Sequence, residues 1–251
     1  MHILLSNDDG ILAPGILALC RALAELGDVS VIAPESPQSA MGHGITVYGP
    51  LAVKPVRLGD RFDGLSVDGR PADCVKLGIT ELLPRRPDLV VSGINDGANV
   101  SINVLYSGTV AAAAEGALLG FPAVAVSLEQ GENRDFDQAA LIAVGIIRRL
   151  LERGLSNGQL VNINIPDLTP GPPRGVRVVP MATRGMRDRY VRFRAPDGRD
   201  YYWLDGGEFQ HADPSDSDLD ALAERYVAIT PLQFDLTHYT QLRDLGACKW
   251  E

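Results

Sequence analysis

The chain has 251 residues, 45% of them hydrophobic, and carries a formal net charge of −9 at pH 7. This is enough for one large domain, or one domain with an appendage, and the acidic balance argues against a nucleic acid polymer as partner. The three cysteines include no Cys-x-x-Cys pair, and neither a signal peptide nor a membrane-spanning stretch is visible, so we expect a cytoplasmic protein without a membrane partner.

The first predicted elements form a β-α-β unit. Residues 2–5 are an apolar run ended by the turn cluster Asn7-Asp8-Asp9-Gly10, a pattern typical of a buried strand. Residues 14–26 carry apolar side chains at helical spacing, and residues 29–33 form a second buried strand. This order implies a parallel sheet with a right-handed crossover.

The alternation continues after a loop rich in Pro, Ser and Gly at residues 34–44. Further strands are predicted at 45–56, 62–67, 88–92, 123–127 and 160–165, the first two in a pattern that a hairpin would also give. Further helices are predicted at 71–83, 110–119 and 136–153. The predicted fold class is therefore α/β, with a doubly wound, mostly parallel sheet.

The composition changes beyond Pro170, where three prolines form a linker-like stretch. Extended segments are predicted at 176–180, 190–194 and 201–204, a short helix at 217–223, a strand at 226–230 and a terminal helix at 237–245. The segments at 190–194 and 201–204 resemble a protruding hairpin, which can serve subunit contact. An ordinary surface hairpin explains the pattern equally well. We expect a catalytic core in residues 1–170 and a C-terminal extension in residues 171–251.

Polar clusters follow buried strands or begin the next helix at four places. They are Asn7-Asp8-Asp9, Gln38-Ser39, Asn95 to Asn99, and Ser107-Gly108-Thr109. Loops that follow different strands of a doubly wound sheet converge at one edge, so these clusters are expected to meet there.

Asp8 and Asp9 suit a hard divalent cation such as Mg²⁺ or Mn²⁺, because two adjacent carboxylates are costly without a positive partner. The alternative is a helix N-cap, although one Asp would suffice for that role. The side-chain oxygen of Asn95 could be a further ligand and Asn99 could orient a phosphate oxygen or a water, whereas a glycine-rich turn would also favour both residues. The hydroxyl of Ser39 is a weak ligand by itself.

Ser107-Gly108-Thr109 directly precedes an alanine-rich helix. Backbone amides at a helix N-terminus bind anions, and the two hydroxyls add donors, but a plain Ser/Thr cap is an equal alternative. His43 lies between two glycines and could act as a general acid or stabilise a leaving group; more often such a histidine is only a loop residue.

Together these residues resemble the family of the survival protein SurE, whose members are metal-dependent nucleotidases. The matching motifs, in order, are Asn7 to Gly10, Pro34 to Ser39, Gly42-His43, Pro71 to Val75, Ser92 to Asn99, Tyr106 to Val110, Asn162 to Pro166 and Ile229 to Leu232. The resemblance covers nearly the whole chain.

This resemblance implies a Rossmann-like, three-layer α/β domain with a C-terminal extension or β-hairpin that forms a homodimer or homotetramer. It implies a 5′-nucleotidase that hydrolyses nucleoside 5′- and 3′-monophosphates, with short polyphosphate as a further substrate of some members. It also implies one divalent metal ion, with the ligands of the family mapping onto Asp8, Asp9, Ser39 and Asn95.

The predicted chemistry is metal-assisted hydrolysis of a phosphomonoester, in which Asp8 orients or deprotonates the attacking water, and Asn99 with residues 107–109 holds the phosphate. A haloacid dehalogenase-type phosphatase needs a second Asp where Gly10 stands, and a zinc deacetylase needs a histidine where Ser6 stands. The remaining alternative is a nucleotide-binding regulatory protein without turnover, which the lack of a Gly-x-Gly-x-x-Gly turn makes less favourable.

Overall fold

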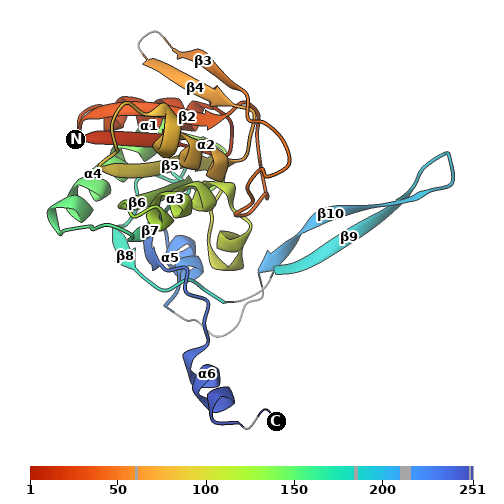
Figure 1. Cartoon of the computed structure of the whole chain (residues 1–251). Helices are drawn as coiled ribbons and strands as arrows, with labels where there is room; N and C mark the ends of the chain where they lie inside the picture. The colour runs from red at the N-terminus through yellow and green to blue at the C-terminus, as the bar shows by residue number, and fades with distance from the viewer. Residues whose placement is uncertain (60–61, 184–185, 210–215, 249, 251) are drawn as a thin grey trace.

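A computed structural model describes residues 1–59, 62–183, 186–209, 216–248 and 250. Its centre is a nine-stranded sheet (Figure 1). In spatial order the strands are β3 (Val53–Leu58), β4 (Phe62–Val67), β2 (Asp28–Pro34), β1 (His2–Ser6), β5 (Leu89–Asp96), β6 (Ala123–Leu128), β7 (Leu160–Ile165), β11 (Val227–Leu232) and β8 (Val176–Val178). The pairings are parallel except for β3 with β4 and β7 with β11.

Helices cover both faces of this sheet. They are α1 (Pro14–Leu23), α2 (Pro71–Leu77), α3 (Gly108–Leu118), α4 (Phe136–Glu152) and α5 (Asp218–Ala223), with a π-helical turn at Gly78–Leu82 and a 3₁₀ turn at Ser101–Leu105. A further helix, α6 (Tyr239–Gly246), lies away from the sheet (Figure 1). Side chains alternate between the faces of a strand, so Ile3 and Leu5 pack with α1 and α4, whereas Leu4 packs with α2 and α3. The predicted α/β class and three-layer, mostly parallel arrangement are confirmed.

The central position of β1 explains why the chain can begin with a fully apolar strand. All five of its residues are buried, and it pairs in parallel register with β2 on one side and β5 on the other. A parallel strand covered on both faces reads as a continuous apolar run. The residues that follow β1 therefore emerge at the middle of the carboxyl edge of the sheet.

The predicted strand at 226–230 does not end before Pro231, since β11 continues to Leu232. Its neighbour β8 pairs with residues 227–229 only, so Pro231 lies where no strand on that side needs a backbone N–H donor. On the other side β11 pairs with β7, opposite Val161 at this position. Both β8 and β11 thus extend the sheet from the C-terminal third of the chain.

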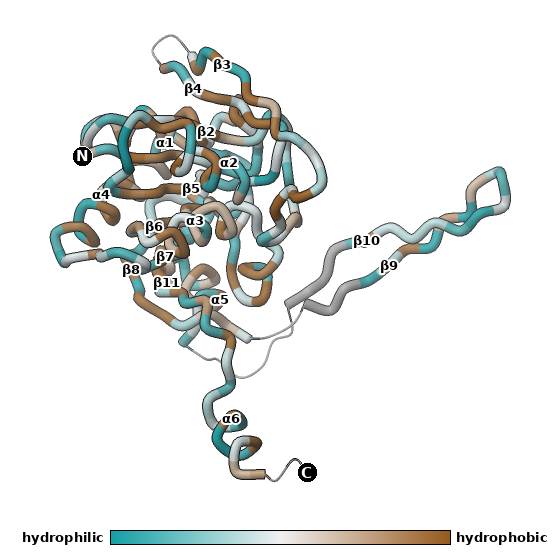
Figure 2. The backbone as a smooth tube through the Cα atoms, viewed as in Figure 1, coloured by the Kyte–Doolittle hydropathy of each residue, from teal (hydrophilic) through white to brown (hydrophobic). Residues whose placement is uncertain are grey.

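Two other C-terminal elements project from the core (Figure 1). The antiparallel strands β9 (Met186–Arg194) and β10 (Asp200–Phe209) form a long two-stranded arm, and α6 follows an extended segment. Hydrophobic and hydrophilic residues intermix along the coloured part of the arm (Figure 2). Helix α6 has no buried residue. No helix in the described residues has the length and apolar character needed to cross a bilayer.

Candidate active site

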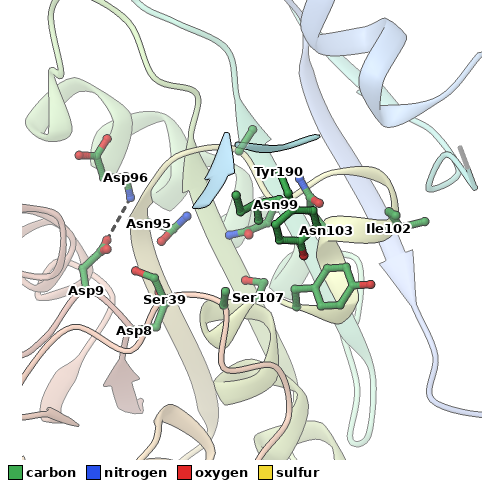
Figure 3. Close-up of a pocket in the computed structure, with 14 residues that line it drawn as sticks. Asp8, Asp9, Ser39, Asn95, Asp96, Asn99, Ile102, Asn103, Ser107 and Tyr190 are labelled. Atoms are coloured by element: carbon green, nitrogen blue, oxygen red, sulfur yellow. Dashed lines mark hydrogen bonds between the residues drawn. The ribbon is translucent and has the colours of Figure 1, made fainter. Parts of the chain in front are cut away.

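Asp8 and Asp9 leave the carboxyl end of β1 in a turn that Asn7 stabilises. The side-chain amide of Asn7 donates to the carbonyl oxygen of Gly10 at 2.8 Å, and Gly10 has a φ of +95°, a conformation that favours glycine. Both carboxylates line one cavity above the sheet edge (Figure 3). This is the placement that the sequence predicts for a strand-end metal site.

Asp8 is 5% exposed, and its carboxylate is fixed by the N-terminus of α3. The hydroxyl of Thr109 donates to Asp8 Oδ1, and the backbone amide of Thr109 also donates to this side chain. Burial raises the pKa of Asp8 to about 6 and the neighbouring charge of Asp9 adds to the rise, although the bonds from Thr109 oppose it. The start of α3, for which the sequence suggests phosphate binding, therefore already binds the carboxylate of Asp8.

Gly108 lets α3 approach Asp8 this closely. A Cβ at position 108 would lie 2.7 Å from Cβ and 2.9 Å from Oδ2 of Asp8, well inside the separation of about 3.5–4.0 Å that carbon atoms prefer. Ser107 is the N-cap, and its hydroxyl accepts the N–H of Val110 at 3.1 Å. The capping role and the proposed anion-binding role thus fall on the same short segment.

The loop after β2 brings Ser39 to the same cavity. The backbone N–H of Gln38 donates to the carbonyl oxygen of Asp8 at 2.7 Å, which ties this loop to the turn after β1. Ser39 is exposed and lines the cavity beside Asp8 and Asp9 (Figure 3). Ser39 therefore lies beside the two carboxylates, although a loop serine alone is weak sequence evidence for a ligand.

Asn95 reaches the cavity from an irregular part of β5. The register with β6 shifts between Ser92 and Asn95, and a Cβ on Gly93 would lie 2.2 Å from the carbonyl oxygen of Val126. Only glycine fits this position, and the bulge redirects the strand end toward Asp9. The amide nitrogen of the Asn95 side chain donates to the carbonyl oxygen of Gly97 at 2.7 Å, which orients the side chain.

Asp96 is a third acidic residue of the cavity and belongs to the polar cluster Asn95 to Asn99, although the sequence predicts no role for it. Its backbone N–H donates to Asp9 Oδ2 at 3.0 Å (Figure 3), and its carboxylate pairs with Arg134 at 2.9 Å. Burial raises the pKa of Asp9, while the bond from the Asp96 amide opposes the rise. The arginine thus lies against Asp96, and Asp9 receives a backbone donor.

Asn99 is held by polar side chains inside the sheet. Its backbone N–H donates to Asn164 Oδ1 at 2.7 Å, and its carbonyl oxygen accepts from the amides of Asn162 and Asn164 at 2.8 and 3.1 Å. Its own side-chain amide donates to Ser127 Oγ at 2.8 Å. The sequence contains a clue to these partners, since Asn162-Ile163-Asn164 places two polar side chains in an otherwise apolar strand. Buried polar groups need hydrogen-bond partners, so the two asparagines are expected to bind another part of the chain.

The cavity has a volume of about 540 Å³, within the range of roughly 300–1,000 Å³ usual for small-molecule sites. Its described lining residues are Asp8, Asp9, Ser39, Ala40, Asn95, Asp96, Ala98, Asn99, Ile102, Asn103, Tyr106, Ser107, Tyr190 and Leu204. The structure thus brings together six of the predicted site residues, while Gly108 and Thr109 lie behind Asp8. Asn103, Tyr106, Tyr190 and Leu204 line the cavity although no sequence pattern predicts a binding role for them.

His43 has a different environment. Its Nε2 lies 2.9 Å from Glu115 Oε2, and the ammonium of Lys76 lies 2.7 Å from Glu115 Oε1. The hydrogen bond from His43 is the main cause that holds the pKa of Glu115 below its ordinary value. Glu115 belongs to α3, so this network ties the loop that carries Ser39 to the helix that carries Thr109.

The donor set suits a hard divalent cation. Asp8, Asp9, Ser39 and Asn95 offer carboxylate, hydroxyl and amide oxygens around one cavity, which are the donors that Mg²⁺ and Mn²⁺ prefer. Among the described residues no group of three or more His, Cys, Asp and Glu side chains could hold a metal. A site here therefore depends on the neutral oxygens of Ser39 and Asn95 as well as on the two carboxylates.

A doubly wound sheet with oxygen donors at the carboxyl ends of β1 and β5 defines a Rossmann-like domain with a polar cavity at its crevice. The chain belongs to the SurE family, because the family profile described as "Survival protein SurE" matches residues 3–188. Membership of this family implies a divalent metal cofactor.

Full-length relatives agree with this assignment. The chain is 45% identical over 250 residues to the 5′-nucleotidase SurE of Syntrophobacter fumaroxidans, covering 100% of this chain and 99% of the relative. It is 46% identical over 245 residues to the 5′-nucleotidase SurE of Pelobacter propionicus, covering 97% of each. The crystal structure of the SurE protein from Aquifex aeolicus superposes with a TM-score of 0.83 at 38% identity, covering 98% of each chain.

Proposed function

We propose that this chain is a metal-dependent phosphomonoesterase that hydrolyses nucleoside 5′- and 3′-monophosphates, with short polyphosphate as a further substrate. One observation carries the proposal: the buried Asp8 carboxylate faces a cavity that also contains Asp9, Ser39 and Asn95. Full-length relatives that are named 5′-nucleotidases support the substrate class.

One Mg²⁺ or Mn²⁺ ion would be held by Asp8, Asp9, Ser39 and Asn95. Bound there, it would supply Lewis-acid stabilisation of charge on the phosphoryl group and lower the pKa of the attacking water. The Asn95 side-chain amide is already oriented through Gly97, so its oxygen is the natural donor. The amide of Asp96 orients Asp9 in the same way.

Asp8 orients or deprotonates the attacking water. Its Oδ1 is fixed by the hydroxyl of Thr109, and this contact holds the carboxylate in one rotamer. Gly108 supports the same geometry, because α3 packs so close to Asp8 that a side chain at position 108 would not fit. Such preorganisation lowers the reorganisation needed in the transition state.

The phosphate is held by Asn99, by Ser107 and by the start of α3. The side-chain amide of Asn99 has two hydrogens, of which one is donated to Ser127, so the other remains for a phosphoryl oxygen. The positive end of the α3 dipole favours both the Asp8 carboxylate and a nearby phosphate.

The role of His43 as a general acid stays a prediction. Its bond to Glu115 supports a different role, in which it anchors the loop that carries Ser39. A pH profile distinguishes the two. Loss of a general acid in His43→Gln removes one limb of the kcat profile, whereas loss of an anchor weakens metal affinity and leaves the shape of the profile unchanged.

We further propose that residues 1–170 form the catalytic core and residues 171–251 an extension that assembles a homodimer or homotetramer. The exposed aromatic side chains on the arm support this assembly, since monomeric proteins seldom leave such residues clustered in solvent. The free thiols of Cys20, Cys74 and Cys248 suit the reducing cytoplasm that we propose as the compartment. Light scattering of the full chain measures the assembly.

The experiment that tests the function is phosphate release from AMP and from 3′-AMP with added Mn²⁺ or Mg²⁺. Asp8→Asn should lose nearly all activity, on the order of 10³-fold or more, and remain folded. The matched control is Asp137→Asn on α4, where an exposed carboxylate that is not among the described lining residues of the cavity is neutralised in the same way. Undiminished activity of Asp8→Asn, or of the wild type in EDTA, contradicts the mechanism, and nucleotide binding without turnover favours a regulatory protein instead.

A further inference from the structure

The cavity that contains the two carboxylates also has an apolar part that the hydrolysis of a phosphate does not require. Asp8 and Asp9 line one part, whereas Ile102, Tyr106, Tyr190 and Leu204 line another. Phosphoryl transfer depends on charged and polar groups, so a cluster of aromatic and aliphatic side chains in the same cavity needs a separate explanation.

The apolar wall comes from two distant parts of the chain. Ile102 and Tyr106 belong to the 3₁₀ turn and the residue that follows it, close to Ser107 in sequence. Tyr190 and Leu204 belong to the arm, where they are directly opposite each other on β9 and β10. Opposed residues of an antiparallel pair point to the same face, so the arm presents this pair to the cavity as a unit.

The two faces of the arm are different surfaces. Alternate residues of a strand lie on opposite faces, so Phe193, Tyr201 and Trp203 lie on the face away from the Tyr190 and Leu204 pair. These three side chains and Ala195 line a separate apolar cleft of about 340 Å³. The two residues of the arm among the described lining of the active-site cavity, Tyr190 and Leu204, therefore lie on one face of the arm.

Tyr106 and Tyr190 both leave much of their surface open, at 58% and 62% exposure. Tyr190 projects over the same cavity as Asn99 and Asn103 (Figure 3). A tyrosine ring that is open in this way offers a flat apolar surface for a planar ligand, and Leu204, which is 50% exposed, offers an aliphatic one. The carboxylate part and this apolar part share one cavity. A ligand in which a sugar joins a phosphate to a flat group could occupy both parts at once.

We propose that Tyr190 and Leu204 of the arm, together with Tyr106, form the wall against which the nucleobase of the substrate stacks. The inference rests on the proposed nucleotidase function and deepens it, because it assigns base recognition to the arm and phosphate chemistry to the core. Stacking on an aromatic ring tolerates any base, since every base has a π-face, but a purine offers more area than a pyrimidine. The wall therefore favours purine over pyrimidine nucleotides without requiring a particular base.

The test compares two substrates that share the phosphate and the sugar. AMP carries a base and ribose 5-phosphate does not, so the ratio of their kcat/KM values isolates the contribution of the base. Replacing a stacking aromatic by alanine commonly costs about 1–3 kcal/mol, a factor of roughly 5 to 150. Tyr190→Ala should reduce the ratio of kcat/KM for AMP to that for ribose 5-phosphate by about tenfold or more. Leu204→Ala should reduce this ratio by less, and Tyr190→Phe should keep the wild-type ratio.

Tyr202→Ala is the matched control, because Tyr202 lies one step further out on the same face of the arm. It pairs with Arg192 and is 61% exposed, almost as much as Tyr190, but it does not line the cavity. Its ratio should equal that of the wild type. Light scattering on each variant shows whether the assembly is retained, so that a change in oligomeric state is not mistaken for a change in stacking.

Three results would overturn the inference. The first is a wild type that prefers AMP over ribose 5-phosphate by less than about threefold, and the second is an unchanged ratio in Tyr190→Ala. The third is an equal loss in Tyr202→Ala, which would indicate a general effect on the arm. In each of these cases phosphate release that depends on Asp8 still supports the phosphatase, whereas a wild type that hydrolyses neither substrate refutes the proposed function itself.

Discussion

Gly108→Ala is the substitution that most directly tests how α3 fixes the catalytic carboxylate. The added methyl group would lie 2.7 Å from Cβ of Asp8, 2.9 Å from its Oδ2 and 3.0 Å from Cγ of Pro71. Carbon atoms prefer about 3.5–4.0 Å, so about 1 Å must be recovered by moving Asp8 or the first turn of α3. The neighbouring Thr109 hydroxyl would then no longer meet Asp8 in the same geometry.

The expected effects on activity and stability differ in size. A misplacement of about 1 Å in a catalytic group can cost on the order of 100-fold in rate. Overpacking costs about 1–3 kcal/mol, but alanine is favoured over glycine in a helix by about 1 kcal/mol, so the net loss of unfolding free energy should be about 2 kcal/mol at most. We therefore expect a folded protein with about 1% of the wild-type kcat/KM for AMP.

The control is Gly145→Ala, an exposed glycine within α4 whose added Cβ would meet no atom within 4 Å. It should leave kcat/KM unchanged and raise the free energy of unfolding by about 0.5–1 kcal/mol, because only the helix propensity changes. The assays are phosphate release with Mn²⁺ and urea unfolding followed by circular dichroism. If Gly108→Ala keeps more than about a third of the wild-type kcat/KM while folded, the close approach of α3 does not position Asp8 for catalysis.

Three further predictions concern the surroundings of the site. Glu115→Gln should lower the free energy of unfolding by about 1–2 kcal/mol at pH 7, because an ionised acceptor of two hydrogen bonds is lost. These bonds hold the Glu115 pKa below its ordinary value of 4.5, so the deficit is complete above pH 4.5 and shrinks as the pH falls through the lowered pKa. Asn164→Ala should cost about 2 kcal/mol and lower kcat, because Asn99 loses two hydrogen bonds. Cys248 should be the thiol that reacts first with a disulfide reagent in the folded protein, since burial raises the pKa of Cys20 to about 11.

Each of these predictions has a result that contradicts it. The free energies of unfolding of Glu115→Gln and wild type, measured by urea titration, should converge as the pH falls through the lowered pKa of Glu115, and a constant difference would mean that the carboxylate charge is not responsible. For Asn164→Ala the comparison is Asn157→Ala in an exposed turn, and equal losses would exclude a specific role for the Asn99 contacts. Equal labelling rates of all three thiols would contradict the assigned burial of Cys20.

Much of the fold follows from the sequence because the signals are local. The apolar run before Asp8 predicts a central strand, and β1 is buried along its whole length between two parallel neighbours. The hairpin predicted from the extended segments at 190–194 and 201–204 is present as β9 and β10. What local signals do not contain is how far an element projects or which distant residue it meets, and so the contact of Tyr190 with the active-site cavity could not be predicted.

The site shows the same limit at the level of single side chains. Convergence of strand-end loops predicts that Asp8, Ser39 and Asn95 meet, and they line one cavity. The same rule does not say that Thr109 donates to Asp8, because two groups brought to one edge can bind each other as readily as a ligand. It also does not say that His43 meets Glu115, since a loop histidine carries no periodic signal.

The charges of the cavity suggest an order for the chemistry. Asp8, Asp9 and Asp96 all line it, and no Lys, Arg or His is among its described lining residues. Arg134 lies beside Asp96 and is paired with it, so the described lining alone would repel a phosphate dianion. The proposed divalent cation at Asp8 and Asp9 would change the sign of the interaction there. On this reasoning affinity for the phosphate depends on prior binding of the metal, whereas the apolar contacts of Tyr190 with a base do not.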